Sequence, residues 1–300
     1  MSQEMFSKNT AVEFLHSSWG VKNVEERLEN DRKNLLDEIV RLTLANVPFQ
    51  SITFMATPSE QRKCPTYEEI KKNGMQGIGG LCYSLNTFVW LLLKGLGFSA
   101  KLASSTVTST AISPNNHLIV LVSDVEKKND LSLVDCGTGF PTFRAVSLNF
   151  DQESPVYHDS FLEYKYVRHD GKILRMHGKG DMVKPNDPPI EGLDFFMGRW
   201  RRFCSFDPEQ CNSTLDPIQI YLSTIDLTPF PKSPRAIVFP EKRAVIAVNN
   251  RLIIENDKGS LETTVMASDE EILKAYVLHF ANIKQDTVRR ALEEWHCLSK

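Results

Sequence analysis

The chain lacks the features that would place it in a membrane or on a nucleic acid. Its apolar run at residues 88–93 is far shorter than the roughly 20 residues that cross a bilayer. Residues 1–6 lack the basic segment followed by an apolar one that marks an export signal. The net charge of −3 gives no electrostatic reason to expect nucleic acid or an anionic membrane as a partner. We therefore expect a cytoplasmic protein with neither as a partner.

The chain also has few cysteines, and their spacing is not that of a metal site. The six cysteines are at positions 64, 82, 136, 204, 211 and 297. In a reducing compartment they are expected to be free thiols. We find no internal repeat and no low-complexity tract. With 300 residues, 41% of them hydrophobic, the chain can bury a substantial core and is expected to form two or three domains.

One of these cysteines, Cys82, stands where a reactive thiolate is favoured. Gly79 and Gly80 end a turn just before it, and apolar residues at helical spacing begin directly after it. The start of a helix has unpaired backbone N–H groups and the positive end of the helix dipole, which together stabilise an anion. A nucleophile of this kind also needs a base.

His117 and Asp135 are the candidates for the base and for the group that orients it. Apolar runs at 118–122 and 131–134 are separated by a charged stretch, which predicts a β-hairpin. If the turn centres on Glu126, the two side chains face each other, with Cβ atoms roughly 4.5 to 5.5 Å apart. A turn centred one residue earlier or later is expected to separate the two side chains. Each residue alone has a plainer interpretation, as a buried cysteine, a capping histidine or a turn aspartate, but together they favour a Cys-His-Asp triad.

These residues resemble the signature of the arylamine N-acetyltransferases, which is Arg-Gly-Gly-Phe-Cys, then a His, then Asp-x-Gly-x-Gly. The matching segments are 79–82, His117 and 135–139. Upstream, Val-Pro-Phe-Gln-Ser at 47–51 is similar to the family's Val-Pro-Phe-Glu-Asn, and downstream, residues 200–206 are similar to its Trp-x-x-x-Tyr-x-Phe. One departure from the signature matters: Ile78 stands where the family usually has arginine.

The resemblance implies an α+β fold with a cysteine-protease-like Cys-His-Asp core. It would have a helical domain at 1–99 carrying Cys82, a β-barrel at 100–207 carrying His117 and Asp135, and an α/β lid at 208–300. The residue patterns agree with this order, because they predict a helix over Val24–Ala45, short strands from residue 100, and strands followed by a helix after residue 235. The site would lie where the first two domains meet.

The function implied by the resemblance is transfer of an acetyl group from acetyl-CoA to a small arylamine or hydrazine, by a ping-pong mechanism through acyl-Cys82. Acetyl-CoA would be a co-substrate, and we expect no bound cofactor, no metal and a monomer. Phe49 would line the acceptor pocket. Thr138, in place of the aromatic residue of many members, would widen that pocket if its side chain points inward.

Two other functions stay open at this point. The first is a cysteine hydrolase or amidase that passes the acyl group to water, since the same triad serves that chemistry. The second is a non-catalytic acyl-CoA binding protein of the same fold, suggested by Ile78.

Overall fold

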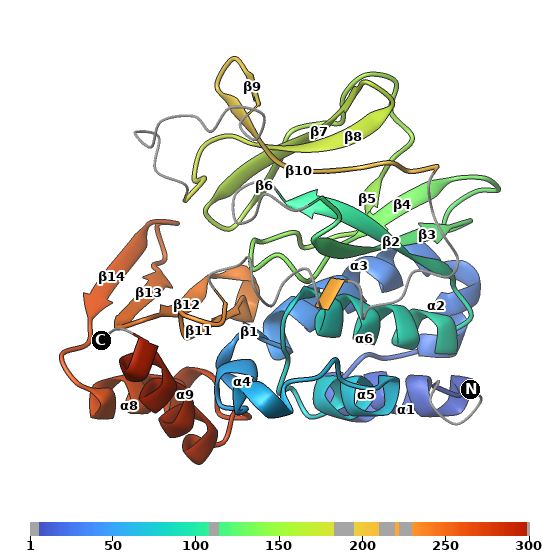
Figure 1. The fold of residues 1–300 in the computed structure, drawn as a ribbon. Helices are drawn as coiled ribbons and strands as arrows, with labels where there is room; N and C mark the ends of the chain where they lie inside the picture. The colour runs from blue at the N-terminus through green and yellow to red at the C-terminus, as the bar shows by residue number, and fades with distance from the viewer. Residues whose placement is uncertain (1–5, 108–113, 183–194, 210–219, 222–229, 299–300) are drawn as a thin grey trace.

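In a computed structural model, the chain is described over residues 6–107, 114–182, 195–209, 220–221 and 230–298. The helices of the first hundred residues, blue to teal in Figure 1, lie along one side of the strands. They and the first short strand are α1 (Lys8–Trp19), α2 (Val24–Asn30), α3 (Arg32–Asn46), β1 (Phe49–Gln50), α4 (Ile52–Met55), the 3-10 turn η1 (Ser59–Gln61), α5 (Tyr67–Met75) and α6 (Cys82–Gly95).

The helix expected over Val24–Ala45 is two helices, because the chain leaves the helical conformation at Asp31 (φ −144°, ψ 41°). The Asp31 carboxylate accepts hydrogen bonds from Arg27 Nε (3.1 Å) and Asn34 Nδ2 (2.6 Å). Aspartate side chains that bond to their neighbours in this way compete with regular helix geometry. The apolar spacing continues across the break, which is why the sequence suggested one helix.

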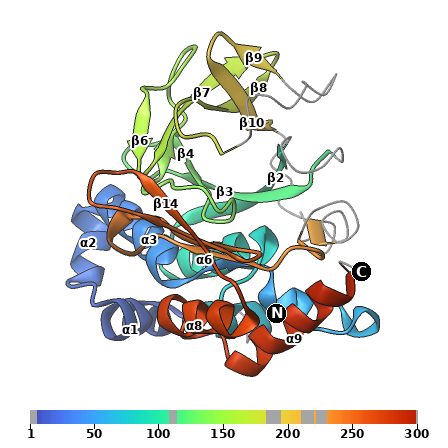
Figure 2. The same ribbon diagram turned by 90° about the vertical axis from the view of Figure 1, so that its left-hand side faces the viewer.

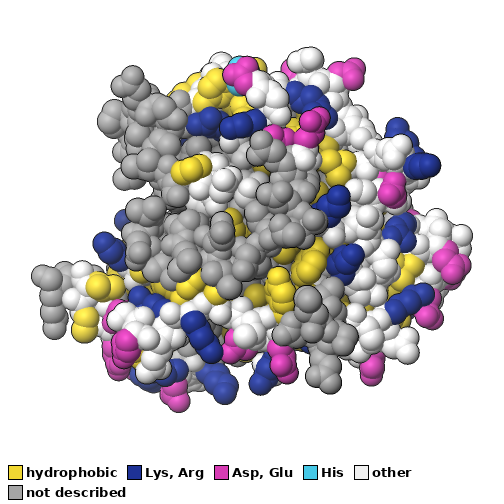
Figure 3. Space-filling model, turned by 45° about the vertical axis from the view of Figure 1, so that its right-hand side comes forward, with side chains coloured by type: hydrophobic (Ala, Val, Ile, Leu, Met, Phe, Trp, Pro, Cys, Tyr) yellow, Lys and Arg dark blue, Asp and Glu magenta, His cyan; other side chains and the backbone are white. Residues whose placement is uncertain are grey.

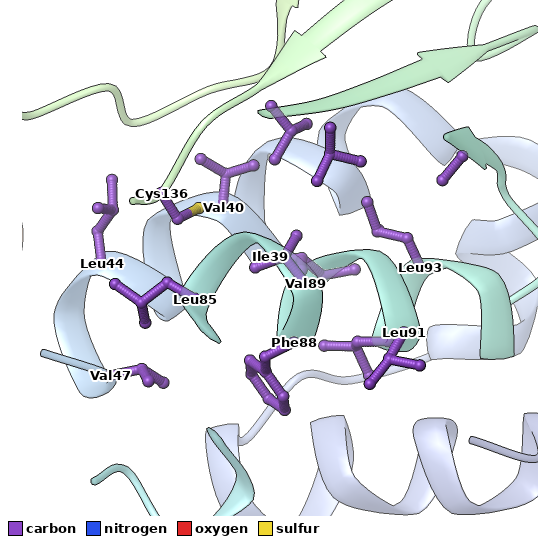
Figure 4. Packing of buried hydrophobic residues seen from close by; sticks show 14 of the residues in the cluster. Ile39, Val40, Leu44, Val47, Leu85, Phe88, Val89, Leu91, Leu93 and Cys136 are labelled. Atoms are coloured by element: carbon purple, nitrogen blue, oxygen red, sulfur yellow. The ribbon is translucent and has the colours of Figure 1, made fainter. Parts of the chain in front are cut away.

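The largest hydrophobic core lies between α3 and α6. Ile39 and Val40 of α3 and Leu85 and Val89 of α6 are all almost fully buried, and Figure 4 shows them packed together. Cys136, which follows a strand of the central sheet, covers the top of the same cluster. Burying an apolar side chain of this size contributes about 1.5–3 kcal/mol. The helix that begins at Cys82 is therefore held firmly against α3.

A curled sheet of nine strands forms the middle of the molecule (Figure 1, Figure 2). Its strands pair in the order β5-β4-β3-β2-β10-β8-β7-β6, with β9 added to β10. Within the described ranges no pairing joins β5 to β6, so the expected barrel is an open half-barrel. The strands are β2 (Ser99–Val107), β3 (His117–Ser123), β4 (Leu131–Val134), β5 (Val146–Ser147), β6 (Tyr157–Asp159), β7 (Leu162–His169), β8 (Lys172–His177), β9 (Phe196–Met197) and β10 (Trp200–Phe206).

A second sheet of five strands, β1-β11-β12-β13-β14, is formed by the last part of the chain together with β1. Phe49 pairs with Ile237 and Gln50 with Ala236, so the N-terminal segment supplies an edge strand to this sheet. Two helices pack on it through a separate hydrophobic cluster (Figure 2). The elements are β11 (Arg235–Val238), the 3-10 turn η2 (Pro240–Lys242), β12 (Val245–Val248), β13 (Arg251–Glu255), β14 (Leu261–Val265), α8 (Asp269–His279) and α9 (Gln285–Leu298).

The surface carries charges of both signs. On the face shown in Figure 3, Lys and Arg side chains of the described residues are interspersed with Asp and Glu. Among the helices of the described ranges, none has the length and apolar character needed to cross a bilayer.

Candidate active site

Cys82 is the first residue of α6, as the glycine turn and the following apolar pattern predict. The preceding residue, Leu81, is extended (φ −82°, ψ 179°) and has no side chain that caps the helix. No acidic residue stands in the first turn. The N-terminal amides and the helix dipole therefore act on the buried Cys82 thiol without competition from a neighbouring carboxylate in that turn.

The glycines before Cys82 connect it to the segment that contains Phe49. Gly79 has φ +75°, and a Cβ there would lie 1.9 Å from the Pro48 carbonyl oxygen, so only glycine fits. Gly80 N–H donates to the Pro48 carbonyl (3.2 Å), and Gln50 N–H donates to the Gly80 carbonyl (2.9 Å). These bonds set Phe49 beside the turn that leads into Cys82.

His117 and Asp135 are brought together by the predicted hairpin. His117 is the first residue of β3, and Asp135 follows the last residue of β4. The two side chains are 3% and 2% exposed, and His117 Nε2 lies 2.9 Å from Asp135 Oδ2 and 3.1 Å from Oδ1. A buried ring nitrogen is thus held by both oxygens of one carboxylate.

The register of this hairpin differs from the expected one. Val120 pairs with Val134, which centres the turn on residue 127 and not on residue 126. Continued, this register sets His117 opposite Gly137. Asp135 is then a diagonal neighbour on the same face, and such neighbours lie roughly 7–8 Å apart, within reach of long side chains. The expectation that a shifted centre would separate the two side chains was therefore wrong.

The electrostatics of the site favour a charged histidine. Burial alone would lower the pKa of His117, but the charge of Asp135, the hydrogen bond to it and a hydrogen bond from the ring to the Cys82 sulfur together raise the pKa to about 10. Burial likewise opposes the charge on Asp135. The positive charge of His117, hydrogen bonds from His117 and Asn86, and the charge of Arg175 nevertheless hold the pKa of Asp135 below its ordinary value.

Asn86 joins the helix to the hairpin, and the sequence analysis did not single it out. It lies one helical turn after Cys82 and is fully buried. Its Nδ2 donates to Asp135 Oδ1 (2.9 Å) and to the Leu118 carbonyl, and its Oδ1 accepts from Cys136 N–H (2.9 Å). An asparagine four residues after Cys82, and so on the same face of the helix as the thiol, was the signal in the sequence.

Arg175 of β8 is a second residue that the sequence analysis missed. It is fully buried, its guanidinium lies 4.6 Å from the centre of the Tyr164 ring, and its Nη2 donates to the Pro141 carbonyl (3.2 Å). Its charge acts on Asp135 from across the sheet. No local pattern marks it, because only the pairing of distant strands places it there.

Gly137 packs directly on Cys82. A Cβ at this position would lie 2.8 Å from Cys82 Cα and 2.7 Å from Asn86 Nδ2, so a side chain would push the loop away from α6. Gly137 N–H also donates to Asp135 Oδ1 (3.1 Å). The Asp-x-Gly spacing noted in the sequence therefore serves both the carboxylate and the thiol.

Cys82 and His117 line a cavity of about 260 Å³. Phe49 and Thr138 line it as well, as does Arg235, so the two predicted pocket residues reach the same space as Cys82. The Thr138 hydroxyl accepts from the N–H of Phe140 (3.2 Å), which fixes the loop at the cavity wall. The other lining residues are mostly apolar: Val107, Asn116, Gly137, Gly139, Phe140, Met182, Phe203, Phe230, Ile237, Ile246 and Val248. In the described part of the chain, no three His, Cys, Asp or Glu side chains are grouped as a metal site requires.

A family model described as N-acetyltransferase matches residues 34–287, which is most of the chain. The chain therefore belongs to the arylamine N-acetyltransferase family, and the predicted enzyme class, an acyltransferase, is confirmed. No curated protein sequence matches it.

Solved structures of arylamine N-acetyltransferases share the fold. The Mycobacterium smegmatis protein is 19% identical, with a TM-score of 0.66 over 87% of this chain and 92% of that one. The Salmonella typhimurium protein is 15% identical, with a TM-score of 0.66 over 88% of this chain and 91% of that one. The Mycobacterium marinum protein in complex with CoA is also 15% identical, with a TM-score of 0.64 over 87% of this chain and 92% of that one. This likeness confirms a mixed α/β fold with a curled half-barrel.

Two of the departures from the family motifs lie next to each other. Gln50 stands where the motif has glutamate, and Ile78 where it has arginine. Gln50 is fully buried, and its Nε2 donates to Thr53 Oγ1 (2.8 Å) and to the Ile78 carbonyl (3.4 Å). A buried carboxylate at position 50 would need a cation, whereas an amide does not. Because residue 50 is an amide here, having Ile78 in place of the motif's arginine leaves no buried charge unpaired at position 50.

Proposed function

We propose that this protein transfers the acetyl group of acetyl-CoA to small arylamines or hydrazines through an acetyl-Cys82 intermediate. The observation that carries the proposal is the buried His117–Asp135 pair, whose His117 lines the same mostly apolar cavity as Cys82 at the start of α6. Family membership supports the reaction class, and the relative in complex with CoA supports acetyl-CoA as the donor.

In the first half-reaction, His117 holds the proton of the Cys82 thiol, and the resulting thiolate attacks the carbonyl carbon of the thioester. Asp135 stabilises the imidazolium and fixes the ring orientation. The carbon–sulfur bond to CoA breaks, the CoA sulfur takes the proton from His117, and the acetyl group stays on Cys82. Backbone N–H groups at the start of α6 are suited to stabilise the negative oxygen that develops.

In the second half-reaction, the nitrogen of the amine attacks the acetyl carbon and gives its proton to His117, which passes it to the departing Cys82 sulfur. An arylamine or hydrazine is weakly basic and therefore has a free electron pair at neutral pH. The mostly apolar wall that includes Phe49 and Phe230 suits a flat aromatic ring better than it suits water. This lining favours transfer to an amine over the hydrolase alternative.

The test pairs acetyl-CoA with a panel of arylamines and hydrazines and measures the acetylated products by chromatography and mass spectrometry. We expect product with wild type and none with Cys82→Ser. The matched control is Cys297→Ser, which removes an exposed cysteine near the C-terminus and should leave the rate unchanged. Free acetate without any acetylated amine would instead establish the hydrolase function.

The same proposal includes a C-terminal lid over the site, a cytoplasmic monomer and no bound cofactor. Ping-pong kinetics would appear as parallel lines when reciprocal rate is plotted against reciprocal amine concentration at several acetyl-CoA concentrations.

A further inference from the structure

Arg235 brings a positive charge to the cavity wall, and the mechanism above does not use it. It is the first residue of β11, and its backbone is fixed by two hydrogen bonds to Ser51. Arg235 N–H donates to Ser51 Oγ (3.1 Å), and Ser51 N–H donates to the Arg235 carbonyl (3.0 Å). The pairing of β1 with β11 therefore sets the position of Arg235 relative to Phe49.

The guanidinium of Arg235 has no carboxylate partner among the described residues. Its Nη2 donates to Ser233 Oγ (2.8 Å), and its Nε is buried and has no acceptor. Burial lowers the pKa of Arg235, and the one side chain that opposes this effect is Tyr276, not an Asp or Glu. Arg235 is partly buried, and a partly desolvated charge without a carboxylate partner favours an anion beside it.

The surroundings of Arg235 limit what that anion can be attached to. Of the cavity-lining residues that the structure describes, Arg235 is the sole Lys or Arg, and none is Asp or Glu. Its guanidinium lies 5.2 Å from the centre of the Phe230 ring, and Phe230 packs edge-on against Phe49 at 5.5 Å. A continuous aromatic wall thus joins the cation to the space that Cys82 and His117 line.

We propose that Arg235 binds a carboxylate carried on the aromatic ring of the acceptor, so that aminobenzoate-type arylamines are preferred to neutral ones. The proposal rests on the proposed function, because the amine must reach acetyl-Cys82. A guanidinium can hold a carboxylate with two parallel N–H···O bonds, and the terminal nitrogens of Arg235, unlike its buried Nε, are the ones that can reach a ligand in the cavity. Hydrogen bonds between charged groups of this kind correspond to about a 10- to 100-fold preference.

The test compares kcat/KM for 4-aminobenzoate with kcat/KM for its methyl ester, which has the same ring and amine but no charge. In Arg235→Gln we expect the ratio of the two values to fall about 10- to 100-fold. Arg235→Lys should keep part of the preference. The matched control is Arg243→Gln, which removes an arginine that pairs with Glu241 and Asp257 outside the cavity lining and should leave the ratio unchanged. An unchanged ratio in Arg235→Gln overturns the proposal.

A carboxylate can also arrive on the acyl group, and a separate measurement distinguishes this source. The rate of Cys82 acylation is followed without any amine, using acetyl-CoA and then succinyl-CoA. We expect Arg235→Gln to change neither rate by more than about threefold, far less than the preference expected for the acceptor. If the variant instead loses reactivity toward succinyl-CoA alone, the anion belongs to the acyl donor and the acceptor assignment is wrong.

Failure of the proposed function would be recognised separately. If wild type acetylates no amine, calorimetric titration of 4-acetamidobenzoate and of neutral acetanilide still tests Arg235. Tighter binding of the acid by wild type, lost in Arg235→Gln, supports the anion site. Equal binding of the two compounds by wild type overturns it.

Discussion

Replacing Asn86 with alanine should damage both the stability of the protein and the reactivity of Cys82. The side chain is fully buried and makes three hydrogen bonds: to the Asp135 carboxylate, to the Leu118 carbonyl and from Cys136 N–H. Alanine cannot replace any of them. The variant therefore removes the hydrogen bonds of Asn86 that join the helix carrying Cys82 to the hairpin carrying His117 and Asp135.

The size of the effect follows from the groups that lose a partner. The buried Cys136 N–H would be left without an acceptor, which costs about 1–3 kcal/mol. Asp135 Oδ1 would keep its bonds from His117 and Gly137 but lose the one from Asn86, and a hydrogen bond to a charged group contributes about 1.5–3 kcal/mol. We expect the free energy of unfolding to fall by about 2–5 kcal/mol. A misplacement of about 1 Å between reacting groups lowers rates by about 100-fold, and we expect a loss of that order in transfer.

The assay combines urea unfolding with the rate at which iodoacetamide alkylates Cys82 below the unfolding transition. The matched control is Asn46→Ala, which removes an exposed asparagine bonded to the Leu42 carbonyl and should change neither quantity appreciably. If Asn86→Ala is destabilised but Cys82 reacts and transfers acetyl groups as in wild type, then Asn86 is purely structural and our reasoning about the site is refuted.

Three further predictions concern the triad and its surroundings. Cys82→Ser should fold normally and show no transfer, because a serine hydroxyl stays protonated at this site, and a rate near that of wild type would remove Cys82 from the mechanism. The pKa of His117 is raised from 6.5 to about 10, so the stabilisation from its charge is complete below pH 6.5 and is lost as the pH rises toward 10. An NMR titration should therefore show the His117 ring still protonated at about pH 8, and a midpoint near 6.5 would contradict the ion pair. Gln50→Glu alone should lower the urea midpoint by burying an unpaired carboxylate, and adding Ile78→Arg should restore part of it; no recovery would show that the two positions are independent.

Local signals in the sequence were sufficient for the elements that present the site. The glycine turn and the apolar spacing predicted the start of α6 at Cys82, and the structure has it there. The two apolar runs around the charged stretch predicted the β3–β4 hairpin. These features depend on turn geometry and side-chain periodicity within a short segment, which a single sequence records.

Features that depend on distant contacts could not be predicted in the same way. The hairpin register is set by a turn that holds Asp130, whose carboxylate accepts from the N–H groups of Val125, Glu126 and Lys127, and apolar alternation alone does not reveal it. Arg235 reaches the cavity because β1 pairs with β11, which are separated by most of the chain. No spacing rule connects such positions, so only the folded structure identifies residues of this kind as part of the cavity wall.

The most direct test of the account is to mix the protein with acetyl-CoA in the absence of any amine and determine the mass of the intact protein and of its peptides. We predict the addition of one acetyl group, located on the peptide that contains Cys82, and its rapid loss when an arylamine is added. His117→Ala should form this species far more slowly. If Cys82 stays unmodified while amines are acetylated, the acetyl group passes directly between the substrates, and the acyl-cysteine mechanism is wrong.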